Sequence, residues 1–87
     1  MNIELIEKEK NVIRMKIDDL TFVNLLNENI WKQKIEYSVY KKDHPYLSQP
    51  ILEVKSKEPK KSLIDAAERI KKDAEEFKTK LERVLKD

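Results

Sequence analysis

The 87-residue chain contains no glycine and no cysteine, and it has only three prolines. Phosphate-binding loops, dinucleotide-binding turns and the sharp turn that presents a catalytic serine all need glycine where the backbone turns tightly or approaches a ligand. The lack of cysteine excludes disulfides and thiolate metal sites, and it fits a reducing, cytosolic compartment. These absences exclude several classes of enzyme and predict a cytoplasmic protein.

Long apolar runs and a strong net charge are also missing. No apolar stretch approaches the ~20 residues of a transmembrane helix, and the N-terminus has no apolar core of the kind found in signal peptides. Nineteen basic residues nearly balance seventeen acidic ones, so the formal net charge is only +2. Such a small excess creates no requirement for nucleic acid. We therefore expect a soluble protein without direct contacts to nucleic acid or membrane.

The sequence does contain a regular apolar pattern. Hydrophobic residues make up 39% of the chain and charged residues 41%, and the apolar positions are spaced periodically, which favours a folded protein over a disordered one. A chain of this length forms a single small domain, so we assign residues 1–87 to one domain.

The first part of the chain predicts a hairpin followed by a helix. Residues 2–9 and 12–18 alternate between apolar and polar side chains and indicate two antiparallel strands with one covered face. A helix should follow from Leu20 to Trp31, with Asp19 or Thr21 accepting a bond from its first free amides. The covered face of the second strand should consist of Ile13, Met15 and Ile17.

The middle of the chain predicts two more strands. Ile35, Tyr37 and Val39 repeat with period two and indicate a strand over residues 34–42. Residues 44–50 contain two prolines and form a stiff connector. A fourth strand should follow from Ile51 to Lys57.

A long helix is predicted at the end of the chain. Glu58 and Pro59 are typical of a helix start, because the missing N–H of proline costs nothing in the first turn. Neither glycine nor proline interrupts the sequence from Lys60 to Lys86, which would span about 40 Å as a helix. Its apolar residues recur at alternating intervals of four and three and share one face. They are Leu63, Ala67, Ile70, Ala74, Phe77, Leu81 and Val84.

Together these elements predict an α+β fold with two layers and the order β-β-α-β-β-α. Both helices should cover one face of a four-stranded antiparallel sheet. The strands of such a sheet are only about 20–25 Å long, so the last turns of a 40 Å helix would project beyond it. We expect the N-terminal half of that helix to cover its own sheet and the C-terminal half to contact another protein.

Two motifs carry a resemblance to a known family. Residues 18–26, Asp-Asp-Leu-Thr-Phe-Val-Asn-Leu-Leu, resemble the helix-opening motif of archaeal RNA polymerase subunit L, although Leu20 stands where the family usually has histidine. Residues 44–50, His-Pro-Tyr-Leu-Ser-Gln-Pro, are similar to the connector between strands three and four of that family. The acidic-proline start of the last helix also matches, and the resemblance covers essentially the whole chain.

The resemblance implies an architectural role in transcription. Subunit L is the counterpart of eukaryotic RNA polymerase II subunit 11 and of the dimerisation portion of the bacterial alpha subunit. In the family it pairs through both helices with the D subunit of the polymerase, and this heterodimer is the platform on which the large catalytic subunits assemble. The nucleotidyltransferase chemistry of the DNA-directed RNA polymerase then belongs to other chains.

We therefore predict no catalytic residue, no cofactor, no metal site and no small-molecule substrate in this chain. The functional residues should form a helical contact layer for the other half of the heterodimer. The predicted layer consists of Phe22, Leu25, Leu26, Ile70, Ala74, Phe77, Leu81 and Val84.

Other chemistry-bearing residues have simpler interpretations. His44 is the only histidine and lacks the second ligand or base that zinc binding or catalysis needs. Asp18 and Asp19 suit helix capping better than a calcium site. Trp31 is compatible with either a lid on the core or an anchor for a partner. A loose group of lysines should form a solvated face, with a contact to protein or nucleic acid as alternatives. These are Lys41, Lys42, Lys55, Lys57, Lys60 and Lys61.

Two other functions fit the same sequence. The apolar stripe could build a homodimeric α+β interaction module of unrelated role, which would form a tight homodimer on its own. A small nucleic-acid-binding protein would instead show an affinity for DNA or RNA that falls steeply with salt.

Overall fold

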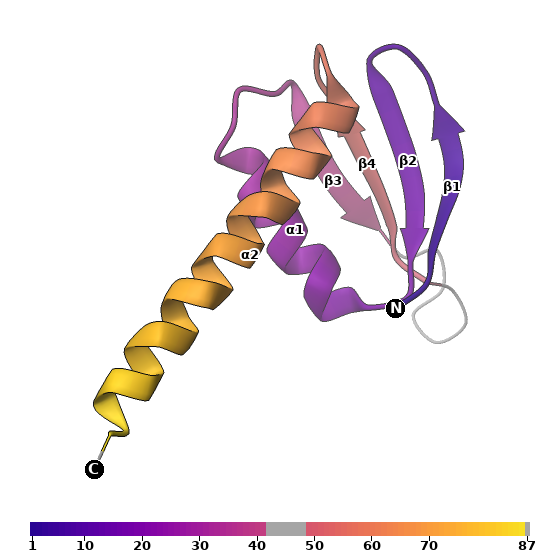
Figure 1. Cartoon of the computed structure of the whole chain (residues 1–87). Helices are drawn as coiled ribbons and strands as arrows, with labels where there is room; N and C mark the ends of the chain where they lie inside the picture. The colour runs from indigo at the N-terminus through magenta and orange to yellow at the C-terminus, as the bar shows by residue number, and fades with distance from the viewer. Residues whose placement is uncertain (42–48, 87) are drawn as a thin grey trace.

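The computed structural model describes residues 1–41 and 49–86, which form a four-stranded antiparallel sheet with two helices on one side (Figure 1). The sheet has the strand order β1-β2-β4-β3, so β1 and β3 are its edges. The α+β class and the order β-β-α-β-β-α confirm the prediction from the sequence. In chain order the elements are β1 (Ile3–Lys8), β2 (Val12–Ile17), α1 (Leu20–Trp31), β3 (Tyr37–Lys41), β4 (Ile51–Lys55) and α2 (Pro59–Val84).

The β1–β2 hairpin forms without glycine. The turn closes when the Glu9 N–H donates to the Val12 carbonyl at 2.8 Å, and within residues 1–41 and 49–86 no backbone φ is positive. The predicted covered face of β2 is confirmed, because Ile13 and Ile17 are buried and Met15 packs against the core. On β1, a β-bulge shifts the pairing register between Leu5 and Glu7.

The third strand differs from its prediction. It begins at Tyr37 and not at residue 34, and its buried residue is Ser38, whereas Val39 is exposed. A hydrogen bond explains why Ser38 faces the interior, because its hydroxyl donates to the side-chain carbonyl of Asn27 on α1. Residue 42 and positions 44–48 of the predicted connector lie outside the described residues. The fourth strand is also shorter than predicted and ends at Lys55.

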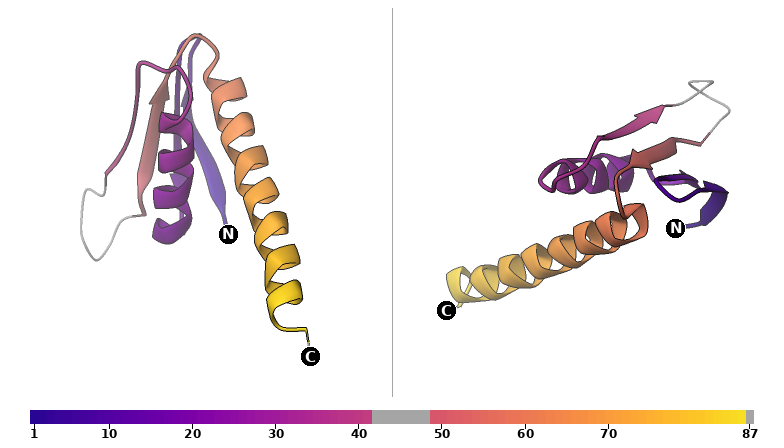
Figure 2. Two further views of the ribbon diagram at one scale, coloured as in Figure 1. Left: turned by 90° about the vertical axis from the view of Figure 1, so that its left-hand side faces the viewer. Right: turned by 90° about the horizontal axis from the view of Figure 1, so that it is seen from above.

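The core lies between the sheet and both helices (Figure 2). Strands β2 and β4, helix α1 and the first turns of α2 all contribute to it. Because apolar residues of both helices join one cluster with one face of the sheet, the helices share that face. The buried cluster consists of Ile17, Val23, Leu26, Ile30, Leu52, Val54 and Ala66.

Helix α1 begins and ends where the sequence predicts. Asp19 is its N-cap, and its carboxylate accepts the Phe22 N–H at 2.9 Å. Thr21, the alternative cap, lies inside the first turn. The Asp18 carboxylate accepts the Asn2 N–H at 2.9 Å and ties the start of the chain to the helix. Both aspartates therefore have structural partners.

Helix α2 extends well beyond the sheet (Figure 1). It contains 26 residues and is about 39 Å long at 1.5 Å per residue. Pro59 lies in its first turn, as predicted, and the helix ends at Val84. The last residue of α2 with partial burial is Ile70, and every residue from 71 to 84 is exposed. Within the described residues, neither helix is both long and apolar enough to cross a membrane.

Candidate subunit interface

The apolar face of α2 that packs on the sheet continues past the sheet. Eighteen residues make about five full turns of an α-helix, so residues eighteen apart lie on the same side. Pro59 and Ala66 are buried in the domain. Five turns further on, Phe77 and Val84 lie on the same side of the helix as Pro59 and Ala66, but both are exposed to solvent.

The exposure of these side chains is large for apolar residues. Phe77 is 66% exposed, Leu81 42% and Val84 78%. Leu81 in turn lies five turns from Leu63, which is half-buried and packs against the core. One part of this apolar stripe is buried in the core and the other part is exposed to solvent. Such a continuous exposed apolar surface is typical of a site that a second protein covers.

Two predicted contact residues connect the core to the projecting part of α2. Ile70 is half-buried and packs against the core cluster, and Ala74 one turn later is exposed. The short side chain of Ala74 lets another backbone approach closely. The sequence prediction omitted Leu85, which is 67% exposed, and its spacing of four residues from Leu81 was the signal that could have included it.

Helix α1 presents its predicted contact residues at three depths. Leu25 is exposed and Phe22 is half-buried against the core. Leu26 is only 5% exposed and belongs to the buried cluster itself. Leu26 therefore supports the layer from beneath, and of the three predicted contact residues on α1 only Phe22 and Leu25 reach the surface.

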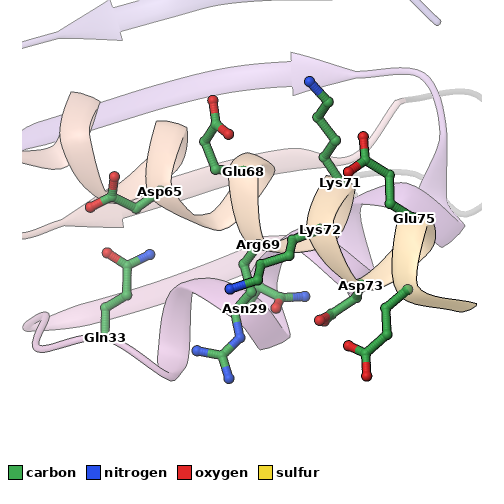
Figure 3. Close-up of a pocket in the computed structure, with 10 residues that line it drawn as sticks. Asn29, Gln33, Asp65, Glu68, Arg69, Lys71, Lys72, Asp73 and Glu75 are labelled. Carbon is green, nitrogen blue, oxygen red and sulfur yellow. The ribbon is translucent and has the colours of Figure 1, made fainter.

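A large hollow lies elsewhere, between the end of α1 and the middle of α2 (Figure 3). Its volume is about 780 Å³. Asn29 is buried at its base and donates to the Leu25 carbonyl at 2.9 Å. The charged residues around it do not converge, since Glu68 and Arg69 point to opposite sides of α2 (Figure 3). This hollow gathers no set of groups for catalysis or for an ion.

The face of the sheet opposite the helices carries a polar network across neighbouring strands. Arg14 lies 3.3 Å from the Glu7 carboxylate and 3.1 Å from that of Glu53. The Tyr37 hydroxyl donates to the Glu53 carboxylate. This hydrogen bond to Glu53, together with burial of the hydroxyl and nearby negative charge, raises the pKa of Tyr37 above its usual value. The opposite charges of this network pair across the strands, although the buried Arg14 Nε lies at ion-pair distance from Glu53 without a hydrogen bond.

The residues 1–41 and 49–86 contain no cluster of three His, Cys, Asp or Glu side chains that could hold a metal ion. His44 lies outside the described residues, and its predicted role in the connector stays a prediction.

The comparisons with known proteins agree with this geometry. Residues 10–80 match the family model of the RNA polymerase Rpb3/Rpb11 dimerisation domain. The fold is similar to a crystal structure of DNA-directed RNA polymerase subunit L from Thermoplasma acidophilum, with a TM-score of 0.83 and 28% identity. That likeness covers 94% of this chain and 86% of the other. Comparison with curated proteins gave no match.

The chain belongs to the Rpb3/Rpb11 dimerisation domain family. The predicted resemblance to archaeal RNA polymerase subunit L is confirmed by the family model and by the structural likeness. The matched range contains α1 and the larger part of α2, up to residue 80. Phe77 lies within it, whereas Leu81 and Val84 lie in the final turns beyond it.

Trp31 connects two elements of the Rpb3/Rpb11-type domain. Its indole N–H donates to the Ser38 carbonyl at 2.8 Å, which joins the end of α1 to β3, although half of the residue is exposed. It is therefore a lid at the edge of the fold, with an outer surface that a partner can reach.

The predicted lysine group is largely solvated in this dimerisation domain. Lys41, Lys57, Lys60 and Lys61 are exposed. Lys55 is partly covered and lies 3.5 Å from the Glu36 carboxylate. Lys42 lies outside the described residues.

Proposed function

We propose that this chain is a non-catalytic assembly subunit of an archaeal DNA-directed RNA polymerase, and that it forms a heterodimer with the D subunit of that enzyme. The heterodimer provides the platform on which the large subunits, with the nucleotidyltransferase chemistry, assemble in the cytoplasm. Family membership and the likeness to a subunit L structure support this role. The chain itself needs no substrate, metal or cofactor for it.

The observation that carries the proposal is the uncovered half of α2. Phe77, Leu81 and Val84 continue the buried face of the helix into solvent. Burial of such side chains stabilises a complex by about 1.5–3 kcal/mol each when it is complete. Leaving all three in water in a domain this small is costly, and a partner removes that cost.

The proposed contact layer contains both helices. Ile70, Ala74 and Phe77 form its centre, because burial on α2 ends at Ile70 and the residues that follow it are exposed. Phe22 and Leu25 add the exposed side of α1. Leu81 and Val84 extend the layer along the projecting turns, and Leu26 holds α1 in place from the core side.

Co-expression with the D subunit tests the proposal. Intact-complex mass measurement should find one copy of each chain in the complex. Phe77→Asp places a charge in the contact layer and should abolish recovery of that complex, while the isolated variant keeps its folded sheet. Thr79→Asp is the matched control, because Thr79 lies nearly opposite Phe77 on the same exposed helix.

Undiminished co-purification of Phe77→Asp and Leu81→Asp with the D subunit would show that the contact layer is wrongly assigned. Failure of the unmodified chain to form this complex under any condition would remove the heterodimer.

A homodimeric module is the second candidate, favoured by one observation. The same apolar helix face is available on every copy, and a two-fold contact between identical faces is a common way to bury one. Light scattering separates the two functions. A tight homodimer that persists when the D subunit is present supports the module, whereas weak self-association that gives way to the heterodimer supports the polymerase role.

A further inference from the structure

Strand β1 presents apolar side chains on the side of the sheet that the helices occupy. Ile3 pairs with Ile17 and Leu5 pairs with Met15. Directly paired residues of antiparallel strands point to the same face, and Ile17 and Met15 face the core. Ile3 and Leu5 therefore face the helix layer, yet they are 60% and 57% exposed.

The chain's own helices leave this part of the sheet open. Helix α1 packs beside β3, and α2 packs beside β2. As α2 runs towards its C-terminus it moves away from β1 (Figure 1). The helix layer thus covers one side of the sheet and stops short of the β1 edge.

The open face continues the proposed contact layer. Met15, Leu63 and Ile70 are half-buried and pack against the same core cluster. Leu5 pairs with Met15, and both Met15 and Ile70 border one core cluster. The open face of β1 and the start of the contact layer on α2 therefore lie at the margins of the same core, and a partner that covers both margins touches β1 and α2 together.

The shape and charge of β1 favour a helix as that occupant. The bulge between Leu5 and Glu7 breaks the regular ladder of the edge, which disfavours addition of another strand. The projecting residues 71–84 of α2 span about 21 Å as a helix, and six residues of β1 span about 20 Å. Residues 2–9 carry three acidic side chains and one basic one, so β1 suits a helix with a basic end, and residues 71–86 of this chain, with six basic and four acidic side chains, are an example of such an end.

We propose that the projecting end of the partner domain's long helix lies across Ile3 and Leu5. This inference rests on the proposed function, because the partner is taken to share the Rpb3/Rpb11-type fold and its overhanging helix. When two such domains are related by a pseudo-two-fold axis, the uncovered helix end of each domain contacts the uncovered strand of the other. Phe77, Leu81 and Val84 of this chain then lie on the equivalent strand of the D subunit.

Cysteine labelling tests the contact, because the chain has no cysteine of its own. Leu5→Cys reports on the helix-facing side of β1, and Glu4→Cys on the same strand reports on the opposite side. Each variant is treated with N-ethylmaleimide, alone and in the heterodimer, and the label on this chain is followed by intact mass. With about nine-tenths of the chain in the heterodimer, Leu5→Cys should react about tenfold more slowly than when free. Glu4→Cys should react at the same rate in both.

A second measurement identifies the occupant. When the long helix of the D subunit is shortened by three turns, the heterodimer should still form, and labelling of Leu5→Cys should return to the free rate. Equal labelling of Leu5→Cys in the free chain and in an intact heterodimer overturns the inference and leaves the proposed function standing. Protection that persists with the shortened helix also overturns it, and failure to form any heterodimer overturns both.

Discussion

The two halves of helix α2 have similar side-chain patterns and opposite surroundings. Up to Ile70 the apolar side lies on the sheet and contributes Ala66 to the core. Beyond it the same side is open, and Val84 occupies the direction of Ala66 five turns later. Periodicity thus identifies an apolar face, whereas the length of the sheet decides which part of that face belongs to the domain. The stability of the isolated chain should therefore depend strongly on a substitution in the first half and hardly at all on the same substitution in the second.

The largest expected effect comes from a charge in the buried half. Ala66→Asp places a carboxylate at a fully buried position without a partner and should lower the free energy of unfolding by about 3–5 kcal/mol. Val84→Asp, in the same direction of the helix, should change it by less than about 0.5 kcal/mol. Urea unfolding of the isolated chain followed by circular dichroism measures both. Equal destabilisation by the two variants would contradict the division of the helix.

The adjacent leucines of α1 give a second, smaller contrast. Leu26→Ala removes a core side chain and should cost about 2–4 kcal/mol in the isolated chain. Leu25→Ala should cost little there and should weaken heterodimer formation instead. Urea unfolding and a titration with the D subunit separate the two effects. If Leu26→Ala leaves stability unchanged, Leu26 does not support the contact layer from the core.

The N-cap of α1 should contribute less to the free energy of unfolding than these core side chains. Asp19→Ala removes the bond to the Phe22 N–H and should lower the free energy of unfolding by about 1 kcal/mol. Asp19→Asn keeps an acceptor oxygen and should recover most of that loss. Similar losses for both variants in urea unfolding would mean that charge, and not the hydrogen bond, is what matters at this position.

The smallest effect is a pH dependence in the projecting half of α2. The Lys80 ammonium lies 2.9 Å from the Glu76 carboxylate, and this bond holds the pKa of Glu76 below its usual value. A lowered pKa in the folded chain means that the pair stabilises above the unfolded pKa and that this contribution disappears as pH falls through the folded one.

Thermal unfolding of the chain and of Glu76→Gln measures that contribution. The variant should melt slightly lower near neutral pH and at the same temperature once the pH has fallen below the folded pKa of Glu76. Lys80→Gln should give the same pattern. A difference that persists unchanged in acid would show that the pair is not its source.

The sequence was sufficient for the order of the elements, because period-two and helical spacings distinguish strands from helices. The bounds of α1 also followed, since Asp19 is a clear cap. The face of β3 did not follow, because Ser38 is buried through hydrogen bonds to α1 and not through hydrophobicity. Local spacing contains no information about such contacts between distant residues.

The candidate interface was only partly predictable for a related reason. The projecting side of α2 follows from helix length against strand length, so Phe77 and Val84 could be chosen from the sequence. Leu26 could not be separated from Leu25 in depth, because a helical pattern does not say on which side the sheet lies. The open face of β1 also escaped prediction, since alternation shows that Ile3 and Leu5 share a face and not whether anything covers it.

The turn between β1 and β2 has a consequence for the unfolded chain. Since no described residue needs a positive φ, the fold can be reached by a polypeptide that carries a Cβ at every position. Each alanine in place of glycine at a compatible site narrows the denatured ensemble and is worth about 0.4–1 kcal/mol. A domain with few buried side chains thereby loses less conformational entropy when it folds. Glycine in place of Lys10 or Asn11 would increase that entropy loss and lower the free energy of unfolding.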